Sequence, residues 1–217
     1  MSVPPDLRAA IERDLKRARP LARPSVRALV LVPVALAMVI GIPAVYAFRP
    51  DMAVLGFIRA WGFSIGQAVA GCTIVAVALR ESIPGRALSR RALAAIIAGG
   101  IALPAVVLLL TTSSFTIGPA DHAAWEGFVC FRTSALAALP ALLFAGALAA
   151  RALPLRPAAA GALYGLGAGL MSDAGLRLYC DYSVVTHLLF SHMGAVAGVT
   201  LAGAGLASVI QWIRKDL

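Results

Sequence analysis

Two cysteines and two histidines in the second half of the sequence have the chemistry to bind a soft metal ion or to react with an oxidant. They are Cys130, Cys180, His187 and His192. Thiolate and imidazole are good ligands for zinc, cadmium and copper(I), and two thiols can also form a disulfide in an oxidising compartment. The fifty residues between the cysteines match no local metal motif. The alternative interpretation is therefore two unrelated buried thiols that pack as small hydrophobic groups.

His187 and His192 are five residues apart, which places them about 140° apart around an α-helix. We therefore expect only one of them to face Cys180, and two neutral histidines hydrogen-bonded within a bundle are an equally good interpretation. Asp173 and Arg177 are four residues apart and predict an intramembrane ion pair. In a transporter, Asp173 would instead belong to a proton or ion path.

The composition indicates the environment in which these residues act. The chain of 217 residues is 60% hydrophobic and 13% charged, whereas soluble domains are roughly half apolar and a quarter charged. The formal charge of +9 lies beside the apolar runs, where it sets topology, so we expect no direct nucleic acid binding. Nothing in the sequence resembles a nucleophile with its base, a paired-carboxylate site or a phosphate-binding loop. We therefore expect no enzyme and no cofactor, apart from a possible regulatory soft metal ion.

Six apolar runs approach or meet the length of about 20 residues that a membrane-spanning helix needs. The sequence therefore predicts an all-α polytopic membrane protein, a bundle of six transmembrane helices. Residues 27–210 would form this transmembrane domain and residues 211–217 a cytoplasmic tail. Gln67 and Cys72 fall inside the second run, and we assign them packing roles. The runs are Arg27 to Phe48, Ile58 to Leu79, Ala92 to Leu110, Phe128 to Ala150, Ala158 to Leu178 and Val184 to Ile210.

Residues 1–26 form a separate N-terminal segment. Between Asp6 and Arg19, the apolar residues Leu7, Ile11 and Leu15 recur every four positions among basic ones, which predicts a short amphipathic helix. Such a helix can lie on anionic lipid next to the membrane. It can equally dock a partner, with the three apolar residues as anchors in a groove.

The distribution of lysine and arginine predicts the orientation. Fifteen of them lie on the side of the two termini, and four lie on the other side, namely Arg49, Arg59, Arg132 and Arg177. The positive-inside rule therefore places both termini in the cytoplasm. Cys130, Cys180, His187 and His192 then lie toward the opposite face.

Taken in order, several short stretches resemble the NrsF family. They are the basic tail from Asp6 into the first span, the turn Phe48-Arg-Pro-Asp51, Cys130 opening the fourth span, the connection Leu153-Pro-Leu-Arg-Pro157, and Cys180 followed by His192. The resemblance spans nearly the whole chain. It implies a bacterial inner-membrane protein with six helices that negatively regulates an extracytoplasmic-function sigma factor. It further implies that the N-terminal segment helps to hold the sigma factor, and that Cys130 and Cys180, facing the periplasm, sense heavy metal or related stress.

The resulting hypothesis is a membrane-bound anti-sigma factor whose partners are the sigma factor and the lipid bilayer. It would release the sigma factor when the periplasmic cysteines meet heavy metal or oxidant. The alternative is a small transporter or channel, with polar residues of the fifth and sixth helices lining the path. A structural subunit of a larger membrane complex is a third possibility, in which Gly161, Gly165 and Gly169 would serve close helix packing.

Overall fold

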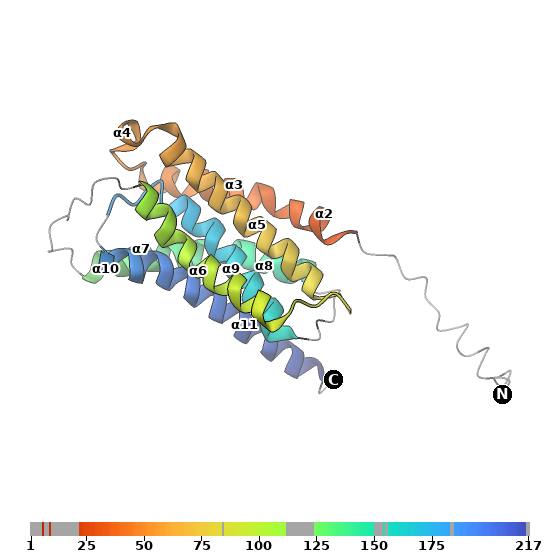
Figure 1. Ribbon diagram of the computed structural model, residues 1–217. Coiled ribbons are helices and arrows are strands. Elements are labelled where there is room, and N and C mark those ends of the chain that lie inside the picture. The colour runs from red at the N-terminus through yellow and green to blue at the C-terminus, as the bar shows by residue number, and fades with distance from the viewer. Residues whose placement is uncertain are drawn as a thin grey trace.

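The chain folds into a bundle of long, roughly parallel and antiparallel helices, shown by a computed structural model (Figure 1). The structure describes residues 22–83, 85–111, 124–149, 156–182 and 185–215, together with the single residues 6, 9 and 154. Within these ranges every regular element is helical, which confirms the predicted all-α class. The predicted anchor residues Leu7, Ile11 and Leu15 lie outside the described residues.

Most of the long helices contain a break or a turn of different pitch. The helices α2 (Pro24–Ala28) and α3 (Val32–Tyr46) are joined by a 3-10 turn at Leu29–Leu31, and α4 (Met52–Phe57) and α5 (Phe63–Glu81) by a π-helical turn at Ile58–Gly62. They are followed by α6 (Arg90–Thr111), α7 (Ala124–Ala137), α8 (Leu139–Ala149) and α9 (Pro157–Leu176), and then by α10 (Val185–His187), a π-helical turn at Leu188–Met193 and α11 (Gly194–Lys215).

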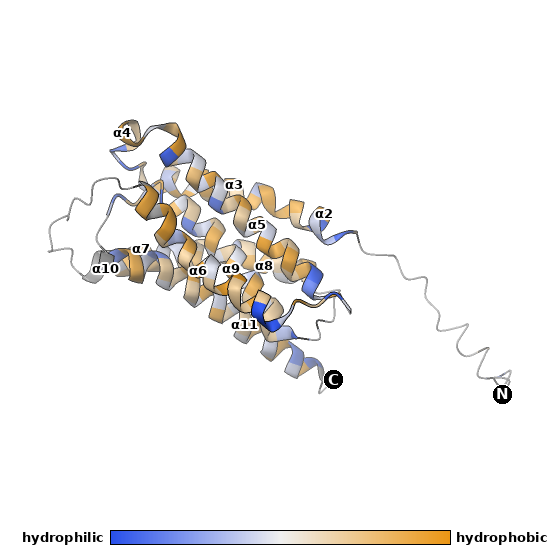
Figure 2. Ribbon diagram, viewed as in Figure 1, coloured by the Kyte–Doolittle hydropathy of each residue, from blue (hydrophilic) through white to orange (hydrophobic). Residues whose placement is uncertain are grey.

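Among the described residues, five helical rods are long and apolar enough to cross a membrane. They are Pro24–Tyr46, Met52–Glu81, Arg90–Val107, Gly127–Ala149 and Leu188–Arg214. These rods agree with five of the six predicted spans. Figure 2 shows hydrophobic residues along the outer helices, and large apolar side chains such as Leu36, Leu143 and Leu201 are exposed there. An exposed apolar surface of this extent fits a bundle surrounded by lipid.

The sixth long helix, α9, corresponds to the fifth predicted span and lies at the centre of the bundle. Every residue from Ala160 to Leu176 is buried. Its neighbours are the helices α3, α5, α6, α7, α8 and α11. It is rich in glycine and alanine and contains Asp173, so it is not among the five most apolar rods. Protein, not lipid, therefore surrounds α9.

Glycines allow α9 to approach its neighbours closely. A Cβ atom at Gly165 would overlap the carbonyl oxygen of Val199 in α11, and one at Gly167 would overlap that of Gly71 in α5. Small residues of this kind permit backbone contact between membrane helices. The helix is therefore held by main-chain contacts on two sides.

The two ends of the bundle differ in chemistry. One end, here called the basic end, contains the first turn of α2 and the last turn of α11 (Figure 1). At this end the buried Glu81 carboxylate accepts hydrogen bonds from the Leu88 N–H, at 2.6 Å, and from Arg156. Arg156 also donates to the Leu88 carbonyl at 2.6 Å. This Glu81 cluster ties the segment before α6 to the start of α9.

Candidate thiol and imidazole site

The opposite end of the bundle brings together three of the four predicted metal-ligating residues. The ligand atoms of Cys130, Cys180 and His187 all lie within 4.8 Å of one another. Cys180 Sγ and His187 Nε2 are 3.2 Å apart and form a hydrogen bond. Both cysteines are free thiols, and all three residues are buried. We call these three residues the thiol cluster, and the end where they lie the thiol end.

Each member of the thiol cluster is positioned by a different element. Cys130 lies in the middle of α7, while Cys180 follows the end of α9. The chain after α9 stays in tight turns, and the Cys180 N–H donates to the Leu176 carbonyl at 2.7 Å. His187 closes α10, and the ring of Tyr182 packs against its imidazole with centroids 5.0 Å apart. The cluster therefore depends on contacts between segments that are distant in the sequence.

A π-helical turn changes the relation between the two histidines. At α-helical pitch they would point about 140° apart. As expected, only one of them, His187, joins the thiol cluster, but the two rings lie closer together than that angle predicts. Leu188–Met193 is π-helical, and hydrogen bonds from residue i to residue i+5 bring residues five apart onto one face. The His187 and His192 rings meet edge to face, with centroids 5.8 Å apart.

From His192 a chain of hydrogen bonds continues into the bundle. Asp173 Oδ1 accepts a hydrogen bond from His192 Nδ1 at 2.7 Å. Its Oδ2 accepts one from Gln67 Nε2, also at 2.7 Å. Gln67 donates further to the Leu170 carbonyl at 3.3 Å. Asp173 is fully buried, so these donors stabilise a carboxyl group that would otherwise be costly in an apolar interior. We call His192, Asp173 and Gln67 the buried polar chain.

Gln67 was expected to have only a packing role, and the structure corrects this. Its amide binds the carboxylate that His192 also binds, so it connects α5 to the polar residues of α9. The available signal was a lone carboxamide in the middle of an apolar run. Such a group needs a partner when it is buried, although the sequence does not say which one.

The predicted ion pair between Asp173 and Arg177 stays a prediction, because the hydrogen bonds described for Asp173 come from His192 and Gln67. The Arg177 carbonyl accepts a hydrogen bond from Arg49 Nη1 at 3.4 Å. Arg49 also pairs with Asp51, with Nε to Oδ1 at 2.5 Å. The hydrogen bond from Arg49 lowers the pKa of the Asp51 carboxyl. The connection between α3 and α4 thus holds the end of α9.

The chemistry available to the thiol cluster follows from its donor set. Two sulfurs and one imidazole nitrogen suit zinc or cadmium, leaving a fourth position for water or another ligand. The hydrogen bond with Cys130, together with burial, raises the pKa of the Cys180 thiol well above its ordinary value. A metal ion would therefore displace a proton from this sulfur. The same two thiols could instead form a disulfide after a small approach.

A comparison with known protein families identifies the family of this chain. Residues 12–212 match the family model NrsF, described as negative regulator of sigma F. The chain belongs to the NrsF family. Comparisons with curated proteins and with solved structures give no significant match. Membership in NrsF implies that the partner is a sigma factor and that the role is regulatory.

Proposed function

We propose that the protein is a six-span anti-sigma factor of a bacterial inner membrane. It binds an extracytoplasmic-function sigma factor on the cytoplasmic side and releases it when the thiol cluster binds a soft metal ion or is oxidised. The observation that carries this proposal is the convergence of Cys130, Cys180 and His187 within 4.8 Å. In a family of negative regulators of a sigma factor, a buried reactive cluster is suited to receive a stress signal.

The signal has to cross the bundle from the thiol end to the basic end. The distance is about 30 Å of hydrocarbon, so it is transmitted by helix movement. The helix α9 connects the two ends directly, because Asp173 lies near its last turn and Arg156 immediately precedes its first. An effector coupling of about 1 to 3 kcal/mol would change sigma affinity roughly 5- to 150-fold.

The N-terminal segment supplies the sigma contact in this proposal, with Leu7, Ile11 and Leu15 as anchors. The test is affinity purification of the tagged full-length protein from its own membranes, beside a version lacking residues 2 to 24. A sigma factor should co-elute with the intact protein and not with the truncation. If neither preparation contains a sigma factor while both are folded and inserted, the proposed partner is wrong.

The sensing half is tested separately with cysteine variants. The double variant Cys130→Ser, Cys180→Ser should keep repression but lose induction by cadmium or oxidant. Cys72→Ser is the matched control, because Cys72 lies in α5 and contacts Met171 at 3.6 Å between sulfurs. A double variant that responds fully to metal would show that the thiol cluster is not the sensor. Intact mass under non-reducing conditions, with and without cadmium, distinguishes a metal complex from a disulfide.

The buried polar chain favours one rival function, a small transporter or channel. An intramembrane carboxyl group such as Asp173 is often part of an ion pathway. Against this rival, both Asp173 oxygens accept hydrogen bonds from side chains of the bundle. Proton or metal flux in proteoliposomes that is lost on Asp173→Asn would support the transporter and count against the anti-sigma factor.

A further inference from the structure

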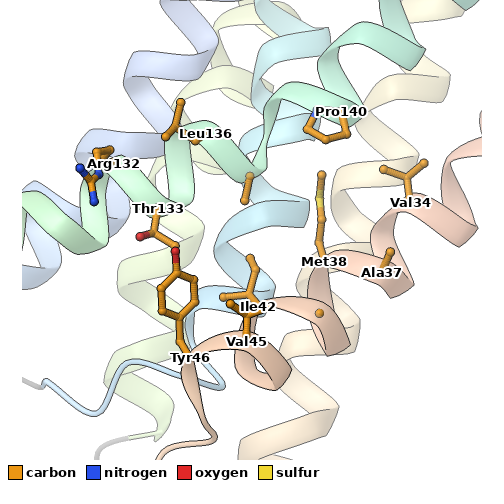
Figure 3. Close-up of a pocket in the computed structure, with 12 residues that line it drawn as sticks. Val34, Ala37, Met38, Ile42, Val45, Tyr46, Arg132, Thr133, Leu136 and Pro140 are labelled. Atoms are coloured by element: carbon orange, nitrogen blue, oxygen red, sulfur yellow. The ribbon is translucent and has the colours of Figure 1, made fainter.

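A groove of about 480 Å³ lies on the outside of the bundle between α3 and the pair α7 and α8. Figure 3 shows that Met38, Ile42 and Val45 of α3 face Leu136 and Pro140 across it. Pro140 lines the groove from α8, just after the break between α7 and α8 at residue 138. Its lining is mostly apolar, and it faces the surroundings of the bundle.

The dimensions of the groove match one lipid tail. Its lining residues on α3 extend from Val34 to Tyr46, and the helical rise between them is about 18 Å. The hydrocarbon of one leaflet is about 15 Å deep, half of a typical bilayer core. The groove therefore reaches from one membrane interface to roughly the middle of the bilayer.

Polar groups are concentrated at one end of this groove. Arg132, Thr133 and Tyr46 lie together there, while Val34 and Pro140 lie toward the other end (Figure 3). The Arg132 side chain is exposed, and it lies two residues from Cys130 at the thiol end. A guanidinium group near a membrane interface attracts the phosphate of anionic lipids and can donate two hydrogen bonds to it.

From this arrangement we propose that the groove binds one acyl chain of an anionic phospholipid, with the headgroup phosphate at Arg132. The tail extends past Ile42 and Met38 toward Pro140. The apolar part of the groove would accept the acyl chain of any lipid. The positive charge of Arg132 favours lipids with an acidic headgroup. The proposal does not depend on the anti-sigma function, since it rests on the groove and its charged end alone.

The groove also borders elements that support the thiol cluster. A Cβ atom at Gly175 of α9 would overlap the Met38 carbonyl oxygen and lie 2.9 Å from Ile42 Cδ1, so the floor of the groove rests on α9. The Tyr46 ring packs against Tyr179, with centroids 5.2 Å apart. A bound lipid would thus contact both α3 and α7 where they flank the thiol cluster.

The test is native mass spectrometry of the purified full-length protein in a non-ionic detergent, titrated with an equal mixture of phosphatidylglycerol and phosphatidylcholine. The wild-type protein should prefer phosphatidylglycerol by about fivefold, the effect of one basic residue near a charged membrane surface. Arg132→Gln should bind both lipids equally, and Arg132→Lys should keep most of the preference. Equal uptake by the wild-type protein, or an unchanged preference in Arg132→Gln, would overturn the proposal.

The tail site is tested by filling the groove. Gly41 lines the groove, and a Cβ added there meets no atom within 4 Å, so Gly41→Leu enters open space without a clash at its first carbon. This variant should bind both lipids more weakly than the wild-type protein, because the leucine side chain occupies the space of the acyl chain. Gly99→Leu in α6 is the matched control, because Gly99 is equally open but does not line the groove. Equal lipid binding by the two variants would contradict the site.

A measurement on the wild-type protein alone makes the test independent of the variants. Phosphatidylglycerol with a photoactivatable diazirine on its acyl chain is incorporated into nanodiscs with the protein, irradiated and mapped by peptide sequencing. Adducts should concentrate on the groove faces of α3, α7 and α8. Adducts spread evenly over the exposed helices, or concentrated on another face, would show that the groove holds no specific lipid.

Discussion

The imidazole of His187 lies against the Cys180 sulfur, at 3.2 Å, and against the rings of Tyr182 and His192. A nitrogen held next to two thiols offers a third ligand to a metal ion, but it is not needed for a disulfide. His187 therefore distinguishes the two chemistries that the cysteines share.

Replacing His187 by alanine should weaken cadmium binding by at least about tenfold, measured on the purified protein by competition with a chromophoric chelator. Disulfide formation between Cys130 and Cys180 under a mild oxidant should persist. Cys72→Ser should bind cadmium like the wild type, because Cys72 lies outside the thiol cluster. Unchanged affinity in His187→Ala would remove this residue from the set of ligands.

Asp173 gives a second prediction, on stability. The change Asp173→Asn removes a charge that accepts hydrogen bonds from His192 and Gln67 in a fully buried position. The loss should be about 1.5 to 3 kcal/mol, seen as a lower midpoint of thermal unfolding in detergent. Asp181→Asn is the control: its side chain is exposed, so the change should cost less than about 0.5 kcal/mol. Equal costs for the two changes would contradict a supporting role for the buried polar chain.

The sequence shows which residue types form the site, but only part of their arrangement in space could be predicted from it. Cys130 and Cys180 share one end of the bundle because the predicted spans place them there. The contact between His187 and His192 could not be predicted, because an α-helix of constant pitch would point the two side chains apart. No pattern in the neighbouring sequence predicts the π-helical turn at Leu188–Met193. Gln67 was missed for a related reason: its partner Asp173 is 106 residues away.

The apolar runs predicted where each helix begins and ends in the sequence better than they predicted where each helix lies in the bundle. The first predicted run, Arg27 to Phe48, and the observed rod Pro24–Tyr46 differ by only a few residues, because hydrophobic length determines a span. The central place of α9 depends on which faces meet, and that depends on backbone contacts at glycines. The glycine pattern indicated close packing and correctly included Gly165.

The contact between α9 and α11 supports a prediction about helix packing. Gly165→Ala places a methyl group on the Val199 carbonyl oxygen, so the helices must separate, at a cost of about 1 to 3 kcal/mol. Gly205→Ala in α11 is the control, because a Cβ there meets nothing within 4 Å. Its effect should be neutral or slightly stabilising, since alanine favours a helix. Thermal unfolding in detergent compares the two, and a similar midpoint for both variants would contradict the close contact.

The bundle as a whole has one basic end and one thiol end, and its orientation in the membrane is a prediction from the arginines. A cysteine-free variant, with serine at positions 72, 130 and 180, provides the background for a test. Ala53→Cys in α4 and Ala87→Cys before α6 are both exposed and lie at opposite ends. In cells with a permeabilised outer membrane, an impermeant maleimide should label position 53, and position 87 only after lysis. The reverse pattern would invert the proposed topology.

The burial of α9 has a consequence for biosynthesis. A helix rich in glycine and alanine with an aspartate near its last turn gains little from entering lipid alone, because its hydrophobicity is low and the carboxyl group opposes insertion. Its surroundings in the finished protein are other helices, among them α11, which is made after it. When synthesis of α9 is complete, one of the helices that bury it in the folded protein, α11, has therefore not yet been made. We expect α9 to enter the bilayer stably only once α11 has emerged.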